Sequence, residues 1–229
     1  LWDTANGKVL SVFDRHLASV TAVAFSPIAP LALSADEAGA AFLWRTDNGE
    51  IVYKLGGSEG AIYSAAFSPN GEMIVTTGDN GAVILWNPDT GQEITRFSSH
   101  ADKVLAATFS PDGHTLATAG DDVAVQLWDI ESQAPRRQFT EFPGPVNSVV
   151  FSPNGRLLAT ASYDEYLACP EPGAPESKPD LPAGRLVQLW DIETGKQLPL
   201  VAGHTRQVTG LAFTSDGSHL ISVSCDGTI

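Results

Sequence analysis

A tryptophan recurs along this chain at a fixed interval, and such an interval constrains the fold more than any local feature. Successive tryptophans are separated by 42, 42, 42 and 62 residues, at Trp2, Trp44, Trp86, Trp128 and Trp190. The phenylalanine of "FSP"-like words follows the same spacing, at Phe25, Phe67, Phe109, Phe151 and Phe213. Two independent markers therefore define a 42-residue unit that occurs five times, with about 20 extra residues in the fourth copy.

Each unit consists of short strand-like segments. Runs such as "VTAVAF", "TLATAG" and "AVQLW" are separated by turn words such as "SPDG", "TDNG" and "IETG". Alternating apolar residues between Gly, Pro and Asn turns are typical of β-hairpins, and no helical period is present. We therefore expect an all-β chain with four strands per unit, the units covering 1–42, 43–84, 85–126, 127–188 and 189–229.

The recurrent words of these units match a known repeat. They are "AGH" ending at His204, "SPDG" at 110–113, Asp122 six residues before Trp128, and "LWD" at 1–3, 127–129 and 189–191. On these words the chain resembles the WD40-repeat family over essentially its whole length. The resemblance implies a β-propeller of four-stranded antiparallel blades, in which each blade buries its faces against its neighbours.

The number of blades is a separate question. The chain holds five repeats, and its last word, "DGTI", needs about one residue before an "LWD" to complete a further unit. WD40 propellers most often have seven blades, which requires roughly 290 residues at this period. We expect an excerpt of a propeller of about seven blades, the alternative being a closed ring of five. Open sheet edges in an excerpt would allow self-association.

Three histidines stand nine residues before their unit's phenylalanine, at His16, His100 and His204. In WD40 proteins this histidine joins a buried network with a Ser or Thr, an Asp and the Trp. The resemblance implies such networks in the third unit, with Gly120 where a serine is usual, and in the last: His100, Asp122 and Trp128; His204, Ser224 and Asp226. We interpret these residues as structural, and we expect no metal site.

The resemblance also implies a rim of contact positions for a partner. In the first unit, either Asp36 or Glu37 could be the equivalent of the network aspartate. One set of contact positions immediately precedes that aspartate: Asp36, Asp79, Asp121, Tyr163 and Cys225. The other set lies four residues before the phenylalanine: Thr21, Tyr63, Leu105, Asn147 and Thr209. Acidic and aromatic side chains together suit a basic peptide with an apolar anchor. The alternative is that these aspartates merely favour tight turns.

The fourth unit carries a proline-rich insertion at about 165–184, and residues 163–185 contain five prolines. Proline favours extended conformations, so the insertion could cover the channel mouth or form a recognition strip; alternatively it is a tolerated surface insertion. The chain's two cysteines, Cys169 and Cys225, form no disulfide framework. They could approach each other as a redox-sensitive pair.

Charge and motifs exclude several classes of protein. The chain has 27 acidic and 13 basic residues and a net charge of -14, which disfavours nucleic-acid binding. No apolar run approaches the ~18 residues of a membrane span, so we expect no membrane insertion. There is no phosphate-binding loop, nucleophile elbow or zinc-protease motif. A quinoprotein dehydrogenase is disfavoured because its Trp follows the glycine of the Asp-x-x-x-Gly motif, whereas here the Trp precedes the Asp.

These observations predict a non-catalytic protein–protein interaction scaffold without a cofactor, in a cytoplasmic setting. Its partner would be a protein or peptide bound at the rim. The alternative is an architectural or regulatory domain of a larger protein with kinase, NTPase or protease-like domains. A propeller enzyme is the least favoured class.

Overall fold

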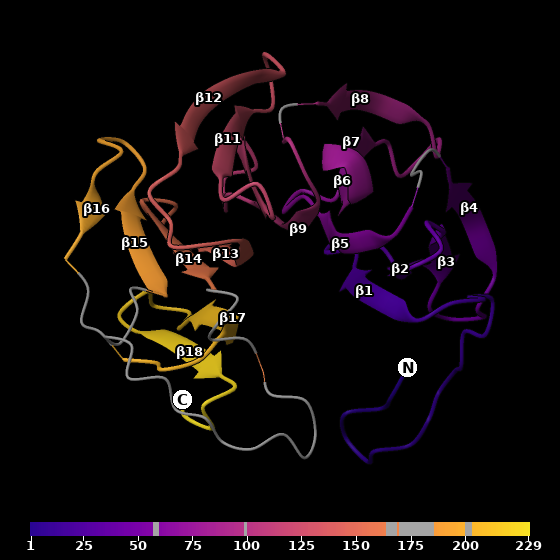
Figure 1. Ribbon diagram of the computed structural model, residues 1–229. Coiled ribbons are helices and arrows are strands. Elements are labelled where there is room, and N and C mark those ends of the chain that lie inside the picture. The colour runs from indigo at the N-terminus through magenta and orange to yellow at the C-terminus, as the bar shows by residue number, and fades with distance from the viewer. Residues whose placement is uncertain (57–59, 99, 164–168, 170–185, 200–202) are drawn as a thin grey trace. The chain divides into compact units, whose positions relative to one another are not determined.

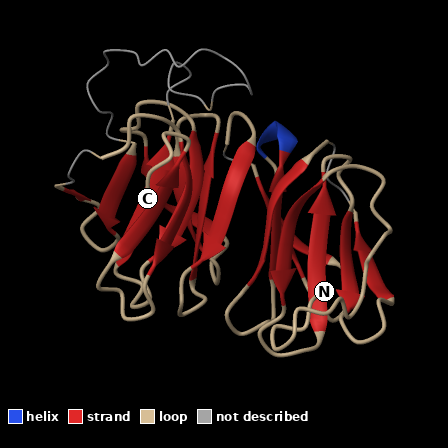
Figure 2. Ribbon diagram, turned by 90° about the horizontal axis from the view of Figure 1, so that it is seen from below, coloured by secondary structure: helices blue, strands red, loops and turns tan. Residues whose placement is uncertain are grey.

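The computed structural model describes residues 1–56, 60–98, 100–163, 169, 186–199 and 203–229, which form antiparallel β-sheets joined by loops (Figures 1 and 2). The only helix in this described part is a single 3-10 turn, η1 (Asp79–Gly81). No helix among these residues is long and apolar enough to cross a membrane.

The strands form four sheets of four strands and one of two, each in sequence order. The first sheet contains β1 (Val20–Phe25), β2 (Leu31–Asp36), β3 (Ala41–Arg45) and β4 (Ile51–Leu55). The second contains β5 (Ile62–Phe67), β6 (Ile74–Gly78), β7 (Val83–Trp86) and β8 (Glu93–Phe97). The third contains β9 (Val104–Phe109), β10 (Thr115–Gly120), β11 (Val125–Asp129) and β12 (Ala134–Phe139).

The fourth sheet contains β13 (Val146–Phe151), β14 (Leu157–Ser162), β15 (Val187–Asp191) and β16 (Gln197–Leu198). The fifth holds only β17 (Val208–Phe213) and β18 (Leu220–Ser224). A sheet is therefore offset from a sequence unit, because the unit boundaries fall inside the third strands and each fourth strand lies in the following unit. The chain divides into two compact units, unit 1 (residues 1–107) and unit 2 (residues 108–229), and each is described by itself.

Burial follows strand position within a sheet. In the first three sheets the second and third strands are almost wholly buried, whereas the fourth strands β4 and β8 are exposed or half-buried up to their last residue, which is buried. In unit 1, Ala22 and Ala24 of β1 pack against a core to which both the first and second sheets contribute. The central strands are therefore apolar on both sides, as expected when sheets stack face to face.

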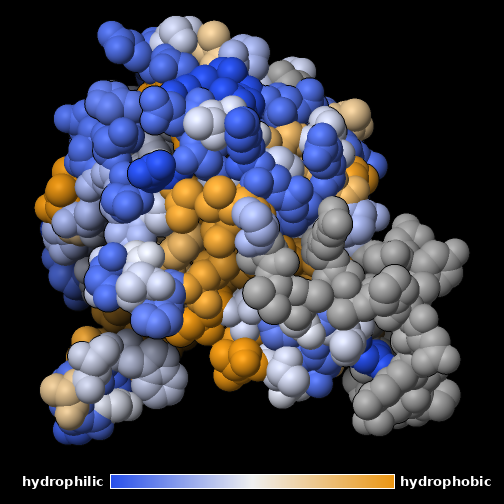
Figure 3. All heavy atoms as spheres, turned by 90° about the vertical axis from the view of Figure 1, so that its left-hand side faces the viewer, coloured by the Kyte–Doolittle hydropathy of each residue, from blue (hydrophilic) through white to orange (hydrophobic). Residues whose placement is uncertain are grey.

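The repeated tryptophan closes the third strand of each full sheet. Four of the five tryptophans have exposed fractions of 6% or less, whereas Trp2 is 67% exposed. Apolar side chains also reach the surface elsewhere, and Figure 3 shows a contiguous apolar area among hydrophilic side chains on the face it draws. The core tryptophans are thus anchors for their sheets, and Trp2 is an exception.

Candidate functional site

A buried chain of hydrogen bonds ties the loop before β1 to the first sheet. Trp44 Nε1 donates to Ser34 Oγ at 3.1 Å, and Ser34 Oγ lies 2.7 Å from His16 Nε2. His16 Nδ1 lies 2.7 Å from Asp36 Oδ2. If His16 donates its Nδ1 proton to the Asp36 carboxylate, its Nε2 accepts from the Ser34 hydroxyl. Each polar group of this chain of bonds then has a hydrogen-bond partner.

The carboxylate of Asp36 also caps its own turn. Its Oδ1 accepts from the backbone N–H groups of Ala38 and Ala40 at 3.0 and 2.9 Å. Burial alone would raise the pKa of Asp36, but the hydrogen bonds and the His16 side chain outweigh it and lower the pKa. Asp36 is therefore a buried network residue, not a rim residue, which corrects the prediction for the first unit.

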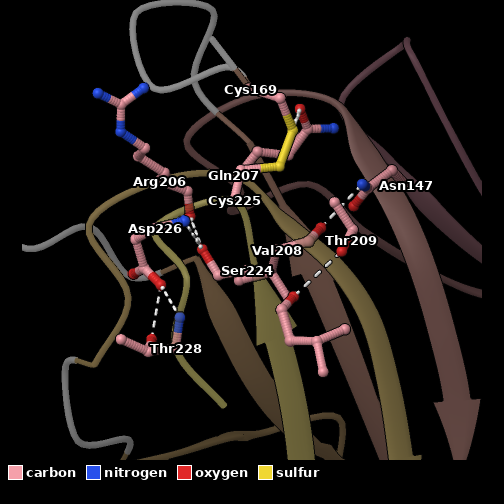
Figure 4. Close-up of a disulfide and its surroundings, with 11 residues drawn as sticks. Asn147, Cys169, Arg206, Gln207, Val208, Thr209, Ser224, Cys225, Asp226 and Thr228 are labelled. Carbon is pink, nitrogen blue, oxygen red and sulfur yellow. Dashed lines mark hydrogen bonds between the residues drawn. A yellow bond between two sulfur atoms is a disulfide. The ribbon is translucent and has the colours of Figure 1, made fainter. Parts of the chain in front are cut away.

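The last repeat forms the same kind of network with one residue different from the prediction. His204 Nε2 lies 2.7 Å from Ser222 Oγ, and Nδ1 lies 3.3 Å from Asp226 Oδ2 and 2.9 Å from Thr228 Oγ1. Ser224 is not in this contact, because its Oγ donates to the Arg206 carbonyl at 2.9 Å (Figure 4). The network serine is therefore Ser222, two residues earlier than predicted.

The other repeats show why the predicted position was displaced. The hydroxyl that accepts from the tryptophan lies inside the second strand, whereas Gly120 and Ser224 lie at its end. The bonds from Trp86, Trp128 and Trp190 to their partners measure 2.8, 2.9 and 3.2 Å, the partners being Thr76, Thr118 and Thr160. His100 is buried, and Asp122 is half-buried in the turn after β10. A Ser or Thr ten residues before the Trp is a sequence signal that would have located this acceptor in the first three full sheets.

The second predicted rim set falls on a recurring irregularity. The pairing of the first two strands shifts at residues 21, 63, 147 and 209, so each lies on a β-bulge. Bulges re-aim side chains and are frequent beside functional sites. Leu105 occupies the equivalent place in β9 and is half-buried.

Three of these bulge residues donate side-chain hydrogen bonds to backbone carbonyls. The Thr21 hydroxyl lies within bonding distance of the carbonyls of Ala35 and Ile62, the latter in the neighbouring sheet. Asn147 Nδ2 donates to the Val208 carbonyl at 2.9 Å, again in the neighbouring sheet, and Thr209 Oγ1 donates to Val223 O at 3.4 Å (Figure 4). Thr21 and Asn147 therefore help to hold adjacent sheets together within their own units.

The other rim set follows the last residue of each second strand. Its backbone N–H bonds back to the residue before the first strand: Asp79 to Ala61 O at 3.1 Å, Tyr163 to Pro145 O at 2.9 Å, and Cys225 to Gln207 O at 3.0 Å. In the first repeat, Glu37 makes this bond, to Ser19 O at 3.0 Å, and its side chain is exposed. Glu37 thus stands where Asp36 was predicted, and Asp121 is the equivalent residue after β10.

In unit 1 the two rim sets meet at Tyr63 and Asp79. The Tyr63 hydroxyl donates to Asp79 Oδ1 at 3.0 Å, and Asp79 Oδ2 accepts from Ala61 N at 2.9 Å. Lys103 Nζ lies 5.9 Å from the Tyr63 ring centroid, in cation–π range. Burial, the hydrogen bond and the charge of Asp79 raise the pKa of the Tyr63 phenol, against the opposing effect of Lys103. The phenol therefore stays protonated and holds the carboxylate in place.

In unit 2 the rim position Cys225 forms a disulfide with Cys169, with the two Cα atoms 5.3 Å apart (Figure 4). The two cysteines do approach each other, as the hypothesis of a pair requires, whereas the Cys225 thiol is not free for a partner. The rest of the predicted insertion, about 165–184, lies outside the described residues. Tyr163, just before it, is half-buried.

Within the described ranges, no group of three or more His, Cys, Asp or Glu side chains is placed to hold a metal ion. The model of the WD domain, G-beta repeat family matches residues 7–45, 49–87, 91–129, 135–168 and 195–229, more than half of the chain. The chain belongs to the WD40 repeat family. These repeats generally mediate protein–protein interaction, and the family is generally non-catalytic.

Two curated WD40-type relatives share short stretches with the chain. Target of rapamycin complex subunit wat1 of Schizosaccharomyces pombe is 49% identical over 45 residues, which are 19% of this chain and 14% of that protein. Protein ROOT INITIATION DEFECTIVE 3 of Arabidopsis thaliana is 49% identical over 43 residues, 19% of this chain and 10% of that protein. Each match therefore has about the length of one repeat.

Proposed function

We propose that this WD40 chain is a non-catalytic platform that binds a protein or peptide partner at the rim, as part of a β-propeller of about seven blades. The rim is defined here as the five residues that stand four places before the phenylalanine and the five residues that follow the second strands: Thr21, Tyr63, Leu105, Asn147 and Thr209; Glu37, Asp79, Asp121, Tyr163 and Cys225. The name of the wat1 relative, a complex subunit, supports membership of a protein assembly.

The observation that carries the proposal is a contrast inside the chain. Framework positions repeat in kind, since each full sheet places a Ser or Thr under its tryptophan. The rim position four residues before the phenylalanine varies more, since it holds Thr, Tyr, Leu, Asn and Thr in the five repeats. Variation at loop-proximal positions of a repeated scaffold is expected where the side chains serve recognition.

The first three repeats place Glu37, Asp79 and Asp121 at the same rim position. Carboxylates beside Tyr63 and Leu105 suit a ligand with Lys or Arg side chains and an apolar anchor. The position of the chain's own Lys103 side chain, 5.9 Å from the Tyr63 ring centroid, supports the idea that this ring can face a cation. We propose a cytoplasmic location, as expected from the sequence.

A peptide-display library tests this proposal with the whole chain as bait. We expect enriched ligands to be basic with one apolar anchor, and to lose binding to a variant carrying Glu37→Ala, Asp79→Ala and Asp121→Ala. A matched control with Asp89→Ala, Glu131→Ala and Glu193→Ala removes the same charge from exposed turns at the opposite ends of the sheets. Ligands lost equally from both variants, or retained by the rim variant, would contradict the proposal.

A further inference from the structure

A pocket of about 250 Å³ lies between the third and fourth sheets of unit 2. It is lined by the turns that follow β9, β13 and β15, so it lies at the ends of the sheets opposite to the rim. Its apolar side chains are Phe151 and Ile192, which are 6% and 8% exposed. Two arginines also line it, Arg136 from β12 and Arg156 from the turn after β13. The pocket therefore combines an apolar wall with two cationic side chains.

Arg136 lies where the pairing of β11 with β12 is irregular. Leu127 pairs with Arg137 and Trp128 with Pro135, so Arg136 has no residue directly opposite it. Such a bulge redirects a side chain from the regular alternation of a strand. Arg136 Nη1 donates to Thr115 Oγ1 at 3.2 Å, the only hydrogen bond of this guanidinium with the described residues. A guanidinium has five N–H donors, so most of those of Arg136 remain available to a ligand.

Arg156 also keeps unused donors beside the pocket. Its Nε lies 3.4 Å from Asp191 Oδ2, and its side chain is 72% exposed. Within the described ranges, the two Nη groups of Arg156 have no acceptor. The nearby Arg137 differs, because its Nη1 and Nη2 donate to two carbonyls of the turn after β15 at 3.2 and 3.3 Å. Arg137 therefore fixes a wall of the pocket, whereas Arg136 and Arg156 retain donors for a ligand.

The other polar groups of the pocket also offer donors. Thr115 Oγ1 and Asn154 Oδ1 each accept hydrogen bonds, but the Thr115 hydroxyl hydrogen and Asn154 Nδ2 have no acceptor in the described part of the chain. The Asp112 carboxylate is engaged within its own turn, where its Oδ1 accepts from His114 N at 3.0 Å. The exposed carboxylate of Glu193 is the main charge that would oppose an anion. This excess of donors suits a ligand that carries mainly acceptors.

A comparison of the repeats distinguishes this junction from the others. Arg136 stands eight residues after its tryptophan, and Arg156 stands five residues after its phenylalanine. The equivalents of Arg136 are Leu10, Val52, Ile94 and Leu198, and those of Arg156 are Pro30, Glu72, His114 and Ser218. No other repeat has an arginine at either position. The repeated fold therefore does not require arginine there, which favours a role in binding.

We propose that this pocket binds the phosphate group of a phosphorylated serine or threonine side chain of a partner protein. Such a group has three acceptor oxygens and close to two negative charges at pH 7, and arginine guanidinium groups match it with paired N–H···O bonds. The pocket volume of about 250 Å³ is below the roughly 300–1,000 Å³ of small-molecule sites, so it suits one side chain of a peptide. This contact is separate from the rim and does not depend on it.

Nuclear magnetic resonance titrations of the ¹⁵N-labelled whole chain test the proposal at about pH 7 and about 150 mM salt, which screens repulsion from the acidic chain. The probes are the N-acetyl amides of phosphoserine, serine and glutamate, together with inorganic phosphate. Arg136→Gln and Arg156→Gln each remove one guanidinium. Arg96→Gln is the matched control, since it removes the same charge from β8, the fourth strand of a sheet in unit 1. The spectrum of each variant verifies that it is folded.

We expect the phosphoserine amide to shift the Nε–H signals of Arg136 and Arg156, and the serine amide to shift neither. Each of these two arginine variants should bind the phosphoserine amide about 10-fold or more weakly, as for loss of a hydrogen bond between charged groups. Arg96→Gln should bind it as the wild type does. Glu193→Gln should strengthen binding about twofold or more, because it removes the opposing carboxylate.

Three kinds of result would overturn the proposal. The absence of any shift at about 10 mM phosphoserine amide would show that the pocket does not hold a phosphate group. Equal affinity for the glutamate amide or for inorganic phosphate would assign the pocket to anions in general and not to a phosphorylated side chain. Unchanged affinity in either pocket arginine variant, or an equal loss in Arg96→Gln, would place the bound phosphate elsewhere on the chain.

Discussion

Reduction of the Cys169–Cys225 disulfide is expected to destabilise unit 2 by about 4 kcal/mol and to leave unit 1 unchanged. The two cysteines are 56 residues apart in the sequence. A cross-link over a loop of that length removes conformational entropy from the unfolded chain, which the loop-closure model values at about 4 kcal/mol at 25 °C. Both cysteines belong to unit 2, so the effect should be confined to it.

Hydrogen exchange with mass spectrometry is the appropriate assay, because a chain of two units need not unfold in one step. Backbone amides of β13, β14, β17 and β18 should exchange faster in dithiothreitol, through global opening of unit 2. Amides of β1 to β8 serve as the internal control. The double variant Cys169→Ser/Cys225→Ser should match the reduced protein and show no response to dithiothreitol.

Two results would refute this reasoning. Equal exchange of unit 2 amides in the oxidised and reduced protein would show that the cross-link does not limit the unfolded chain. A response of the double variant to dithiothreitol would show that the reductant acts elsewhere. Thiol counting before and after reduction, with two new thiols expected, verifies that the disulfide was opened.

Three further predictions concern the framework. Thr160→Val leaves the buried Trp190 indole N–H without its 3.2 Å acceptor, so the free energy of unfolding should fall by about 1–3 kcal/mol in urea titrations; no change would exclude a role for this bond. Gly81→Ala should lower the free energy of unfolding by at least about 1 kcal/mol, because Gly81 has a φ of 70° and a Cβ there would meet the His100 carbonyl. Equal melting temperatures of the variant and the wild type would contradict this. Burial would raise the pKa of Asp226, but hydrogen bonds from Thr228 and the backbone, together with His204, lower it below its ordinary value. The contribution of Asp226 to the free energy of unfolding is therefore full above about pH 4 and is lost as the pH falls further. Asp226→Asn should therefore flatten the acid limb of stability against pH, and an unchanged limb would assign it to other carboxylates.

The repeat period was sufficient to predict the strands, because two markers at one spacing leave little freedom for turns. The expected "TLATAG" and "VTAVAF" runs are β10 and β1, and the four-stranded sheets follow from the same count. The period along the sequence does not determine which residues pair across a hairpin. The bulge at position 21 and its equivalents adds a residue to one strand only, and such an irregularity leaves no trace in spacing along the chain.

Errors in the predicted site have the same physical origin. In the first repeat the register was left open between Asp36 and Glu37, and Asp36 was placed on the rim; it stands eight residues before Trp44, whereas the network residue Asp122 stands six before Trp128. Asp36 therefore lies at the end of β2, opposite Val20, and turns inward to His16. The Ser222-for-Ser224 difference also concerns strand ends, since both serines point to one face of β18, but Ser222 lies inside the strand beside His204 whereas Ser224 is its last residue and bonds the Arg206 carbonyl. No other repeat contains an equivalent of the insertion, so the path of its backbone could not be predicted from the repeat pattern.

The disulfide links the proposed rim to the redox state of its surroundings. Disulfides persist in oxidising compartments and are rare in the cytosol, where glutathione keeps thiols reduced. If the protein is cytoplasmic, two glutathione thiols would reduce the bond, Cys169 and Cys225 would each gain a hydrogen, and one glutathione disulfide would form. Cys225 would then present a thiol at the rim position that Asp79 and Tyr163 occupy in other repeats. The rim of unit 2 would then have two chemical forms. Partner binding measured in oxidised and reduced glutathione should differ for a ligand that contacts β17 and β18 and stay equal for one that contacts unit 1 alone.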